Sequence, residues 1–226
     1  CGFGLIAHMQ GDASHDLVKT AIHSLSCMTH RGGIAADGKT GDGCGLLLAM
    51  PKQFFREEAK KISDITLSEV FAVGTVFLNL DPALAAHSKQ VLTKEIESEG
   101  CKVLGWRVIP TNNDALGSIA MQSLPGFEQI IVNCPMGVTE VEFNRKLLMA
   151  RRRAEEALTA DPYFYVTTLC STVISYKGLM MPAYIADFYT DLADERLASH
   201  IVVFHQRFST NTLPRWPLAQ PFRYLA

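Results

Sequence analysis

Short apolar runs alternate along the chain with longer segments in which apolar residues recur every three or four positions. The first pattern is typical of strands and the second of amphipathic helices. We predict strands at residues 1–9, 45–50, 69–80, 102–110, 127–135 and 200–210, with one or two more within residues 163–178. Helices are predicted at residues 14–28, 51–61, 81–100, 139–160 and 181–199.

Capping residues mark the ends of several predicted helices. Ser14 can cap the first helix, whose buried face is expected to carry Leu17, Ala21, Leu25 and Met28. Asp81 is expected to cap the third helix, with Pro82 in its first turn and Gly100 at its end. These residues therefore agree with the boundaries that the apolar periodicity predicts.

The order of the predicted segments favours an α+β fold. Several strands follow one another without an intervening helix, and residues 163–178 are interpreted as a strand pair or a bent strand with a tight connection. This order is typical of largely antiparallel sheets covered by helices, not of a doubly wound parallel sheet. The glycine patterns of dinucleotide-binding and phosphate-binding loops are also absent from the sequence, because "GDGCG" is too short for the first and lacks the lysine of the second.

Length and charge are those of an ordinary globular protein. A chain of 226 residues can form one large domain or two small ones and can bury a core. The formal net charge of −2 gives no indication of a nucleic-acid or anionic-membrane partner. Arg151–Arg153 are followed closely by Glu155 and Glu156, which predicts a solvated helix face. The sequence has no run of about 18 apolar residues that would predict a membrane span.

Six cysteines, at positions 1, 27, 44, 101, 134 and 170, are scattered along the chain. They show neither a Cys-x-x-Cys pair nor accompanying histidines at zinc-binding spacing. A chain of this size does not need a disulfide framework, so we predict a reducing, cytoplasmic location. The internal cysteines are predicted to be small core residues.

The first residue, Cys1, runs directly into the apolar stretch "GFGLIAHM". An expression boundary, a processed lipoprotein or a hydrolase with an N-terminal nucleophile would each place a cysteine there. A lipidated cysteine is normally followed by a flexible polar tether, which this stretch is not. As a nucleophile, Cys1 would combine a thiol of pKa about 8.5 with an α-amino group of pKa about 8, so the amine can act as base for the thiol.

Two further stretches place an arginine beside residues that suit ligand binding. In "THRGG", Arg31 stands at a helix end next to two glycines that let backbone approach a ligand. In "HQRFSTNT", Arg207 ends an apolar strand and is followed by hydroxyl and amide side chains. An arginine at a strand end with a nearby threonine can hold a carboxylate through paired hydrogen bonds. Taken singly, each stretch also fits a surface salt bridge and a capped turn.

Together these stretches resemble those of the class II glutamine amidotransferases, which are N-terminal-nucleophile hydrolases. The shared motifs are the terminal "CGFG", the "HRGG" about thirty residues later and the strand ending in "HQRFST". The longer stretches "ADGKTGDGCGLLL" and "FHQRFSTNTLPRWPLAQPFRYLA" are similar to one branch of the family, and the resemblance spans the whole chain. It implies an αββα sandwich, in which two largely antiparallel sheets lie between helix layers.

The resemblance also implies roles for individual residues. Cys1 would attack the side-chain amide of L-glutamine, form a thioester and release ammonia, with its own α-amine as base. Arg207 and Thr210 match the positions that hold the substrate α-carboxylate. Arg31 and Gly32 match the stretch that packs beside the nucleophile and helps to close the pocket.

Other positions carry weaker expectations. His205 is expected to support the strand end rather than to transfer protons, because the amine already serves as base. Asn211 stands where some relatives have histidine, so its contact with substrate stays open. In the family, an asparagine–glycine pair that forms the oxyanion hole follows the stretch matching "PFRYLA". Residues 1–226 are therefore expected to be the N-terminal part of the amidotransferase domain, truncated before that pair. Because loss of an oxyanion donor costs about 10²–10³ in rate, this polypeptide alone is expected to have little or no glutaminase activity.

The similar branch implies partners outside residues 1–226. Ammonia would pass through an internal tunnel to synthase domains of the same chain, where 2-oxoglutarate becomes a second glutamate. That step would use FMN, an iron–sulfur cluster and electrons from a small subunit or ferredoxin. The scattered cysteines predict no metal or cofactor in residues 1–226, because a cluster needs a compact ligand set. Two alternatives stay open: an N-terminal-cysteine amidohydrolase for another amide, and a structural fragment without turnover.

Overall fold

The computed structural model describes residues 1–62, 64 and 66–222, and the chain forms two compact units. Unit 1 consists of Cys1–Phe54, Ile109–Leu124 and Ser175–Ala226. Unit 2 consists of Phe55–Val108 and Pro125–Ile174. Each unit is built around its own four-stranded sheet, so the chain crosses between the two units several times.

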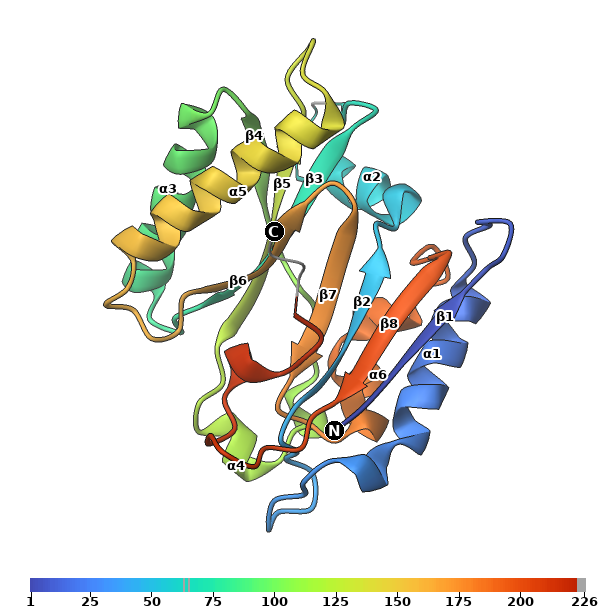
Figure 1. The fold of residues 1–226 in the computed structure, drawn as a ribbon. Helices are drawn as coiled ribbons and strands as arrows, with labels where there is room; N and C mark the ends of the chain where they lie inside the picture. Colours follow the sequence, from blue (N-terminus) through green and yellow to red (C-terminus); the bar gives the residue numbers. More distant parts are fainter. Residues whose placement is uncertain (63, 65, 223–226) are drawn as a thin grey trace. The chain divides into compact units, whose positions relative to one another are not determined.

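The sheet of unit 1 has the order β1-β8-β2-β7 (Figure 1). Its strands are β1 (Gly2–Ala7), β8 (Ile201–Gln206), β2 (Cys44–Ala49) and β7 (Val173–Gly178). Strand β8 is antiparallel to both of its neighbours, and Gln206 pairs with Gly2 on one side and Cys44 on the other. This register brings the first residue of the chain to the end of β8, where residues 207 and 208 follow.

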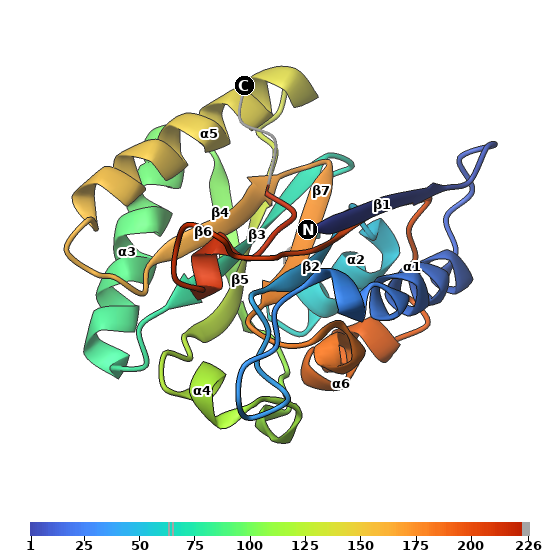
Figure 2. The same cartoon turned by 60° about the horizontal axis from the view of Figure 1, so that its bottom comes forward.

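Helix α1 (His15–Cys27) lies along β1 and β8 (Figures 1 and 2). The predicted cap is confirmed, because the Leu17 N–H donates to Ser14 Oγ at 3.2 Å. The helix fully buries Val18, Ala21 and Leu25, whereas Leu17 and Met28 of the predicted apolar face are only half-buried and Met28 lies just beyond the helix. The helix ends at Cys27, one residue before its predicted end, and the 3₁₀ turn η1 (Thr29–Arg31) connects it to the two glycines of "THRGG".

The single amphipathic helix predicted at residues 181–199 is wrong. Three short pieces stand there instead: η3 (Pro182–Tyr184), α6 (Ile185–Phe188) and η4 (Thr190–Ala193). Tyr189 takes an extended conformation (φ −91°, ψ 92°) and its hydroxyl donates to the Lys177 carbonyl at 2.8 Å. Tyr176 donates to the buried carboxylate of Asp191 at 3.1 Å. These buried contacts with β7 interrupt the helix. The local pattern of apolar residues does not predict such contacts.

The other face of the unit 1 sheet is covered at β7 and β2 by the segment 216–222, which includes η5 (Trp216–Leu218). The Lys177 ammonium donates to the carbonyls of Pro217 and Ala219, both at 2.8 Å. A Cβ on Gly45 would lie 2.7 Å from the Gln220 carbonyl oxygen, so the segment packs directly on the strand. At the β1 edge the same face is open.

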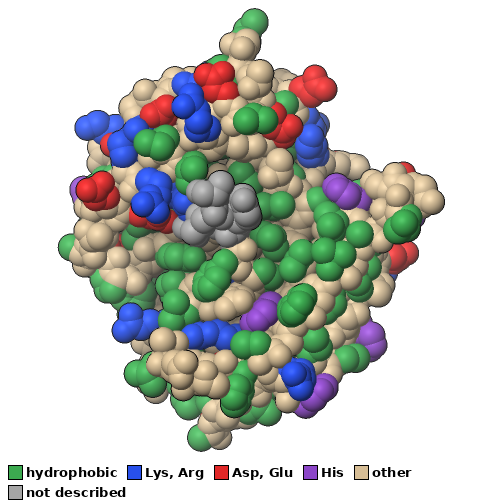
Figure 3. Space-filling model, in the orientation of Figure 1, with side chains coloured by type: hydrophobic (Ala, Val, Ile, Leu, Met, Phe, Trp, Pro, Cys, Tyr) green, Lys and Arg blue, Asp and Glu red, His purple; other side chains and the backbone are tan. Residues whose placement is uncertain are grey.

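The open part of this face carries Phe3 and Leu5, which are 79% and 57% exposed. They occupy alternate positions of β1 and therefore point to the same side of the sheet. Figure 3 shows hydrophobic side chains gathered over β2 and β8 on this face. We call the surface that Phe3 and Leu5 of β1 form the open sheet face.

The sheet of unit 2 has the order β4-β5-β3-β6, and its recorded pairs are antiparallel. Its strands are β3 (Phe71–Leu78), β4 (Lys102–Val108), β5 (Gly126–Asn133) and β6 (Tyr165–Cys170). Helices α3 (Pro82–Ser98) and α5 (Glu140–Ala157) lie side by side on this sheet (Figures 1 and 2). The predicted cap of α3 is confirmed, because Asp81 Oδ1 accepts from the N–H groups of Ala83 and Leu84. The remaining pieces are α2 (Lys52–Lys60), η2 (Asn113–Ala115) and α4 (Ser118–Met121).

Strands β6 and β7 do not form a hairpin, so the strand-pair interpretation of residues 163–178 was wrong, whereas two strands joined by only Ser171 and Thr172 fit the alternative of a bent strand with a tight connection. Strand β6 pairs with β3 in unit 2, whereas β7 lies beside β2 in the unit 1 sheet. The connection is held by α5: the Ser171 N–H donates to Asn144 Oδ1 at 2.9 Å and its hydroxyl donates to Glu140 Oε1 at 2.8 Å. These contacts direct the chain from β6 into β7 without a hairpin turn.

The arginine run in α5 is not a uniformly solvated face, which corrects a prediction. Arg151 is only 3% exposed, because it lies four residues after the buried Leu147 on the same helix face. Burial lowers the pKa of its guanidinium. Arg153 is more exposed and forms ion pairs with Glu95 of α3 and with Glu99, which follows α3, at 2.7 and 2.5 Å. Arg153 therefore links α5 to α3.

The α+β class with two antiparallel sheets and helices, predicted from the sequence, is confirmed. Both sheets contribute buried apolar residues to their own units, and unit 2 has a core cluster that includes Val76, Ile130 and Phe143. Within the described residues, every helix is too short or too polar to cross a membrane.

Candidate active site

Cys1 is exposed and stands directly before β1, at the end of β8. The Phe208 N–H donates to Cys1 Sγ at 3.3 Å, and the Phe208 carbonyl lies 3.6 Å from the same sulfur. The thiol can donate to this carbonyl while its sulfur accepts from the N–H, so the pairing of β1 with β8 holds Cys1 Sγ against the backbone of Phe208.

The "THRGG" stretch lies beside Cys1, as the sequence predicted. The Arg31 guanidinium donates to the Cys1 carbonyl at 3.5 Å, and a Cβ on Gly2 would lie 3.1 Å from the Arg31 Cβ. A Cβ on Gly32 would lie 1.7 Å from Gln206 Nε2 and 2.8 Å from the Arg207 carbonyl oxygen. Only glycine allows residue 32 to approach the end of β8 so closely.

Arg207 is 8% exposed and directs its guanidinium toward the loop before β2. Its Nη1 donates to the Asp42 carbonyl at 3.3 Å, and its Nη2 donates to Thr212 Oγ1 at 2.7 Å. Thr210, the threonine predicted to act with Arg207, is exposed, as is Asn211. The threonine that contacts Arg207 is thus two residues further along the chain than the predicted one.

Asp42 is a site residue that the sequence analysis did not single out. Its Oδ2 accepts from the Ser209 N–H at 2.6 Å, and a Cβ on Gly33 would lie 2.5 Å from the same oxygen. Ser209 in turn donates to the Thr212 carbonyl. Asp42 therefore joins the "THRGG" stretch to the turn after Arg207. The only signal in the sequence was its place in "GDGCG", immediately before a strand that pairs with β8.

His205 and Gln206, the last two residues of β8, carry buried polar side chains. His205 is 8% exposed and Gln206 is fully buried. Within the described part of the chain, His205 Nδ1 and both polar atoms of the Gln206 side chain have no hydrogen-bond partner. Burial lowers the pKa of His205 to about 4, and the positive charges of the Cys1 amino group and of Arg207 act in the same direction. His205 is therefore neutral at physiological pH.

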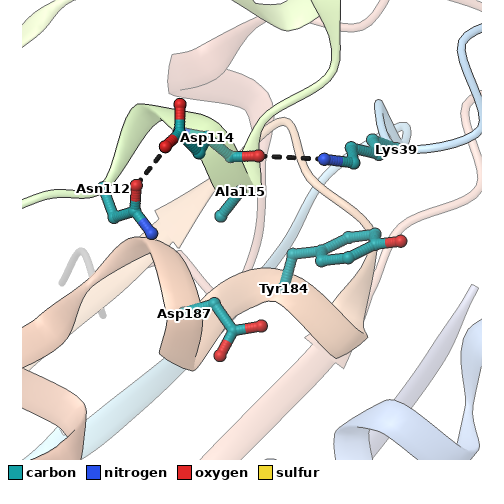
Figure 4. A pocket seen from close by; sticks show the side chains of 6 residues that line it. All are labelled: Lys39, Asn112, Asp114, Ala115, Tyr184 and Asp187. Atoms are coloured by element: carbon teal, nitrogen blue, oxygen red, sulfur yellow. Dashed lines mark hydrogen bonds between the residues drawn. The ribbon is translucent and has the colours of Figure 1, made fainter.

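A separate hollow of about 300 Å³ lies elsewhere in unit 1 (Figure 4). It is lined by Lys39, Asn112, Asp114, Ala115, Tyr184 and Asp187. Lys39 donates to the Asp114 carbonyl at 2.9 Å, and the Asp114 N–H donates to Asn112 Oδ1 at 3.1 Å. The residues that contact Cys1 are not among those that line it.

The side chains of the described residues do not form a cluster suited to a metal ion: no three histidine, cysteine, aspartate or glutamate side chains come together there. All six cysteines are free thiols, of which Cys1 and Cys27 are exposed and Cys44 and Cys101 are buried. The prediction that the internal cysteines are core residues is confirmed for Cys44 and Cys101 and wrong for Cys27.

The fold is that of an N-terminal-nucleophile hydrolase, and the chain belongs to the class II glutamine amidotransferases, whose family model matches residues 1–226. It is 40% identical over 232 residues to the glutamate synthase (NADPH) large chain of Azospirillum brasilense, and the match covers all of this chain and 15% of that protein. It is also 40% identical over 227 residues to the corresponding large chain of Bacillus subtilis, with the same coverage.

A third relative is ferredoxin-dependent glutamate synthase 2 of a Synechocystis strain, which is 39% identical over 229 residues. That match covers all of this chain and 14% of the relative. The chain thus spans about one seventh of the length of these curated relatives. The family that the sequence motifs predicted is confirmed.

Proposed function

We propose that residues 1–226 form the glutamine-hydrolysing region of a glutamate synthase, with Cys1 as the nucleophile. The observation that carries the proposal is the position of the Cys1 sulfur, 3.3 Å from the backbone N–H of the residue after Arg207. This arrangement puts a nucleophile next to an arginine that can bind a carboxylate. A free α-amino acid with a side-chain amide, such as L-glutamine, fits that pair.

The first half of the reaction uses the terminal residue alone. The α-amine takes the thiol proton, the sulfur attacks the side-chain amide carbon, and a carbon–sulfur bond forms. The ammonium then returns a proton to the leaving nitrogen as the carbon–nitrogen bond breaks, which releases ammonia. The Phe208 N–H supports this step because it holds the Cys1 sulfur in place. Water finally hydrolyses the thioester to glutamate.

Arg207 is proposed to hold the substrate α-carboxylate. Its guanidinium has five N–H groups, and contacts to the Asp42 carbonyl and Thr212 use one on each of Nη1 and Nη2. Donors therefore remain for a carboxylate. Thr210, three residues after Arg207, is exposed and is proposed to supply a hydroxyl, while Arg31 and Gly32 are proposed to close the pocket beside Cys1.

The longer protein is proposed to pass ammonia to synthase domains of the same chain, where 2-oxoglutarate accepts it. FMN and an iron–sulfur cluster are proposed to act there, with electrons from a small subunit or ferredoxin. The side chains of the described residues do not fit a cluster, because they bring together no set of metal ligands. We also propose a cytoplasmic location, with which the six free thiols agree.

The decisive test is labelling of the full-length protein with a diazoketone analogue of glutamine, followed by intact mass and peptide mapping. We expect one adduct on Cys1 that excess glutamine prevents. The adduct should vanish in Cys1→Ser and persist in Cys27→Ser, the matched control, because Cys27 is the other exposed cysteine. Arg207→Lys should slow labelling, since lysine cannot make paired hydrogen bonds to a carboxylate.

Two results would contradict the proposal in different ways. An adduct on Cys1 that glutamine does not prevent would indicate an N-terminal-cysteine amidohydrolase for another amide. No adduct on Cys1 in the full-length protein would indicate a structural region without turnover. A parallel assay of residues 1–226 alone tests the expectation that this polypeptide has little or no glutaminase activity.

A further inference from the structure

His205 carries a buried polar atom that the reaction outlined above does not use. Residue His205 is only 8% exposed, and its Nδ1 has no hydrogen-bond partner within the described residues. An unpaired buried polar atom is costly, so it normally binds water or a group that arrives later. The position of this atom therefore matters for what it binds.

The strand register places His205 beside Cys1. Phe3 pairs with His205, and the same register continued by two residues sets Cys1 opposite Arg207. Side chains alternate along a strand, so Cys1, Phe3, His205 and Arg207 all belong to one side of the sheet. His205 is a diagonal neighbour of Cys1, a position at which Cα atoms are about 7–8 Å apart. Side chains at such diagonal positions can approach one another, so their polar groups can be joined through one water molecule.

The charges around His205 come from several elements. Arg207 follows it on β8, the amino group and thiol of Cys1 precede β1, and Arg31 of η1 contacts the Cys1 carbonyl. Lys177 of β7 packs against Gly45, the register partner of His205 on β2. Asp42 provides a nearby negative charge: its carboxylate accepts from the Ser209 N–H, and its carbonyl accepts from Arg207. The groups around His205 are mostly positive, so a positive charge on its imidazole would be disfavoured.

We propose that His205 is a positioning residue for the Cys1 amino group, with Nδ1 accepting a hydrogen bond, through one water, from the ammonium that forms when the amine takes the thiol proton. This inference rests on the proposed function. It requires the ring proton on Nε2, so that Nδ1 is the acceptor. Because His205 stays uncharged, the amine alone takes up and returns the proton, and the imidazole fixes the direction of one ammonium N–H.

The role has a measurable consequence for the amine. A hydrogen bond to the ammonium favours the charged form, so removal of the acceptor lowers the pKa of the amine and weakens it as a base. In His205→Phe, which keeps the ring shape without an acceptor, we expect kcat/KM for glutamine to fall about threefold to tenfold. The acidic limb of the pH profile, where protonation of the amine removes the base, should also move to lower pH by about half a unit to one unit.

His205→Asn and His205→Gln form the matched pair. The side-chain carbonyl of asparagine reaches the position of Nδ1, whereas that of glutamine reaches closer to Nε2. We therefore expect His205→Asn to retain the wild-type pH profile and His205→Gln to resemble His205→Phe. All variants are made in the full-length protein, and circular dichroism checks folding. If His205→Phe does not fold, the asparagine and glutamine variants decide.

The pH dependence of Cys1 labelling by the diazoketone provides a second measurement that does not depend on turnover. The same downward shift in His205→Phe and its absence in His205→Asn support the inference. Identical profiles in wild type and His205→Phe, or equal shifts in the asparagine and glutamine variants, overturn it while leaving glutamine hydrolysis intact. Failure of the wild type to show glutamine-protected labelling instead overturns the proposed function itself.

Discussion

Gly32 is the residue at which the site tolerates the least change. A Cβ there would meet the Gln206 amide at 1.7 Å and the Arg207 carbonyl at 2.8 Å, and the second of these is backbone. We expect Gly32→Ala to lower the free energy of unfolding by about 1–3 kcal/mol, because β8 must shift to make room. The same shift should move Phe208 away from Cys1 and slow diazoketone labelling.

Gly126→Ala is the control for this change. A Cβ on Gly126 would meet its nearest atom at 3.7 Å, an ordinary contact distance. Thermal unfolding and labelling of both variants are compared with wild type. Equal effects of the two substitutions, or unchanged labelling in Gly32→Ala, would show that the close approach to β8 is not needed.

Sequence motifs predicted the residues that gather at Cys1 better than the contacts among them. Arg31, Gly32 and Arg207 do lie at the end of β8 beside Cys1. The partner of Arg207 is Thr212, however, because the turn after β8 folds back through Ser209. Asp42 was missed for a similar reason: its contact with Ser209 joins residues that are 167 positions apart. Pairings of this kind depend on the sheet register, which the pattern of apolar and polar residues along the chain does not predict.

At the scale of elements, Asp37 ties the loop before β2 to helix α4. Its carboxylate accepts from the N–H groups of Lys39, Thr40 and Ile119 and from the Thr40 hydroxyl. Burial alone would raise the pKa of Asp37, but these hydrogen bonds outweigh it and hold the pKa far below its usual range. The folded state therefore favours the ionised form.

The depressed pKa of Asp37 fixes the direction of a pH effect. Its contribution to stability is present above the pKa of an unfolded aspartate, about 3.9, and is lost as the pH falls below that value. We expect Asp37→Asn to lower the free energy of unfolding at neutral pH by about 1 kcal/mol. It should also flatten the loss of stability between roughly pH 4 and pH 2.

Denaturant unfolding at several pH values measures both effects. Asp114→Asn is the control, since the recorded hydrogen bonds of Asp114 are made by its backbone. An Asp37→Asn protein that loses stability in acid as steeply as wild type would contradict the assignment.

Elements were predicted well where one local pattern decides them and poorly where distant contacts do. The capped helices α1 and α3 and strands such as β3 and β8 were expected from periodicity and capping residues alone. Residues 181–199 have the helical pattern too, yet buried hydrogen bonds from Tyr176 and Tyr189 break them into short pieces. The separation of β6 from β7 likewise depends on Ser171 being held by α5.

At the scale of the whole molecule, the open sheet face is the surface feature with the clearest physical consequence. Phe3 and Leu5 are exposed on β1, a strand at the edge of its sheet. An apolar edge strand offers unpaired backbone groups to another chain. We expect residues 1–226 to self-associate as concentration rises, and the double substitution Phe3→Thr, Leu5→Thr to reduce this association while keeping β-strand propensity.

Sedimentation velocity over a concentration series measures the association. Met136→Gln is the control, because Met136 is fully exposed but lies outside the strands of both sheets. A concentration dependence that the double substitution leaves unchanged would show that the edge of β1 is not the contact.

The pairing of β1 with β8 also has a consequence for the order of events during synthesis. Residues 2–7 leave the ribosome about 200 residues before their partners at 201–206. A pairing between such distant segments closes a long loop and forms slowly. Until Phe208 has emerged, Cys1 has no backbone N–H to hold its sulfur. The contact that holds the Cys1 sulfur can therefore form only after residues up to 208 have been made, so the assembly of this end of the sheet is a late event in folding.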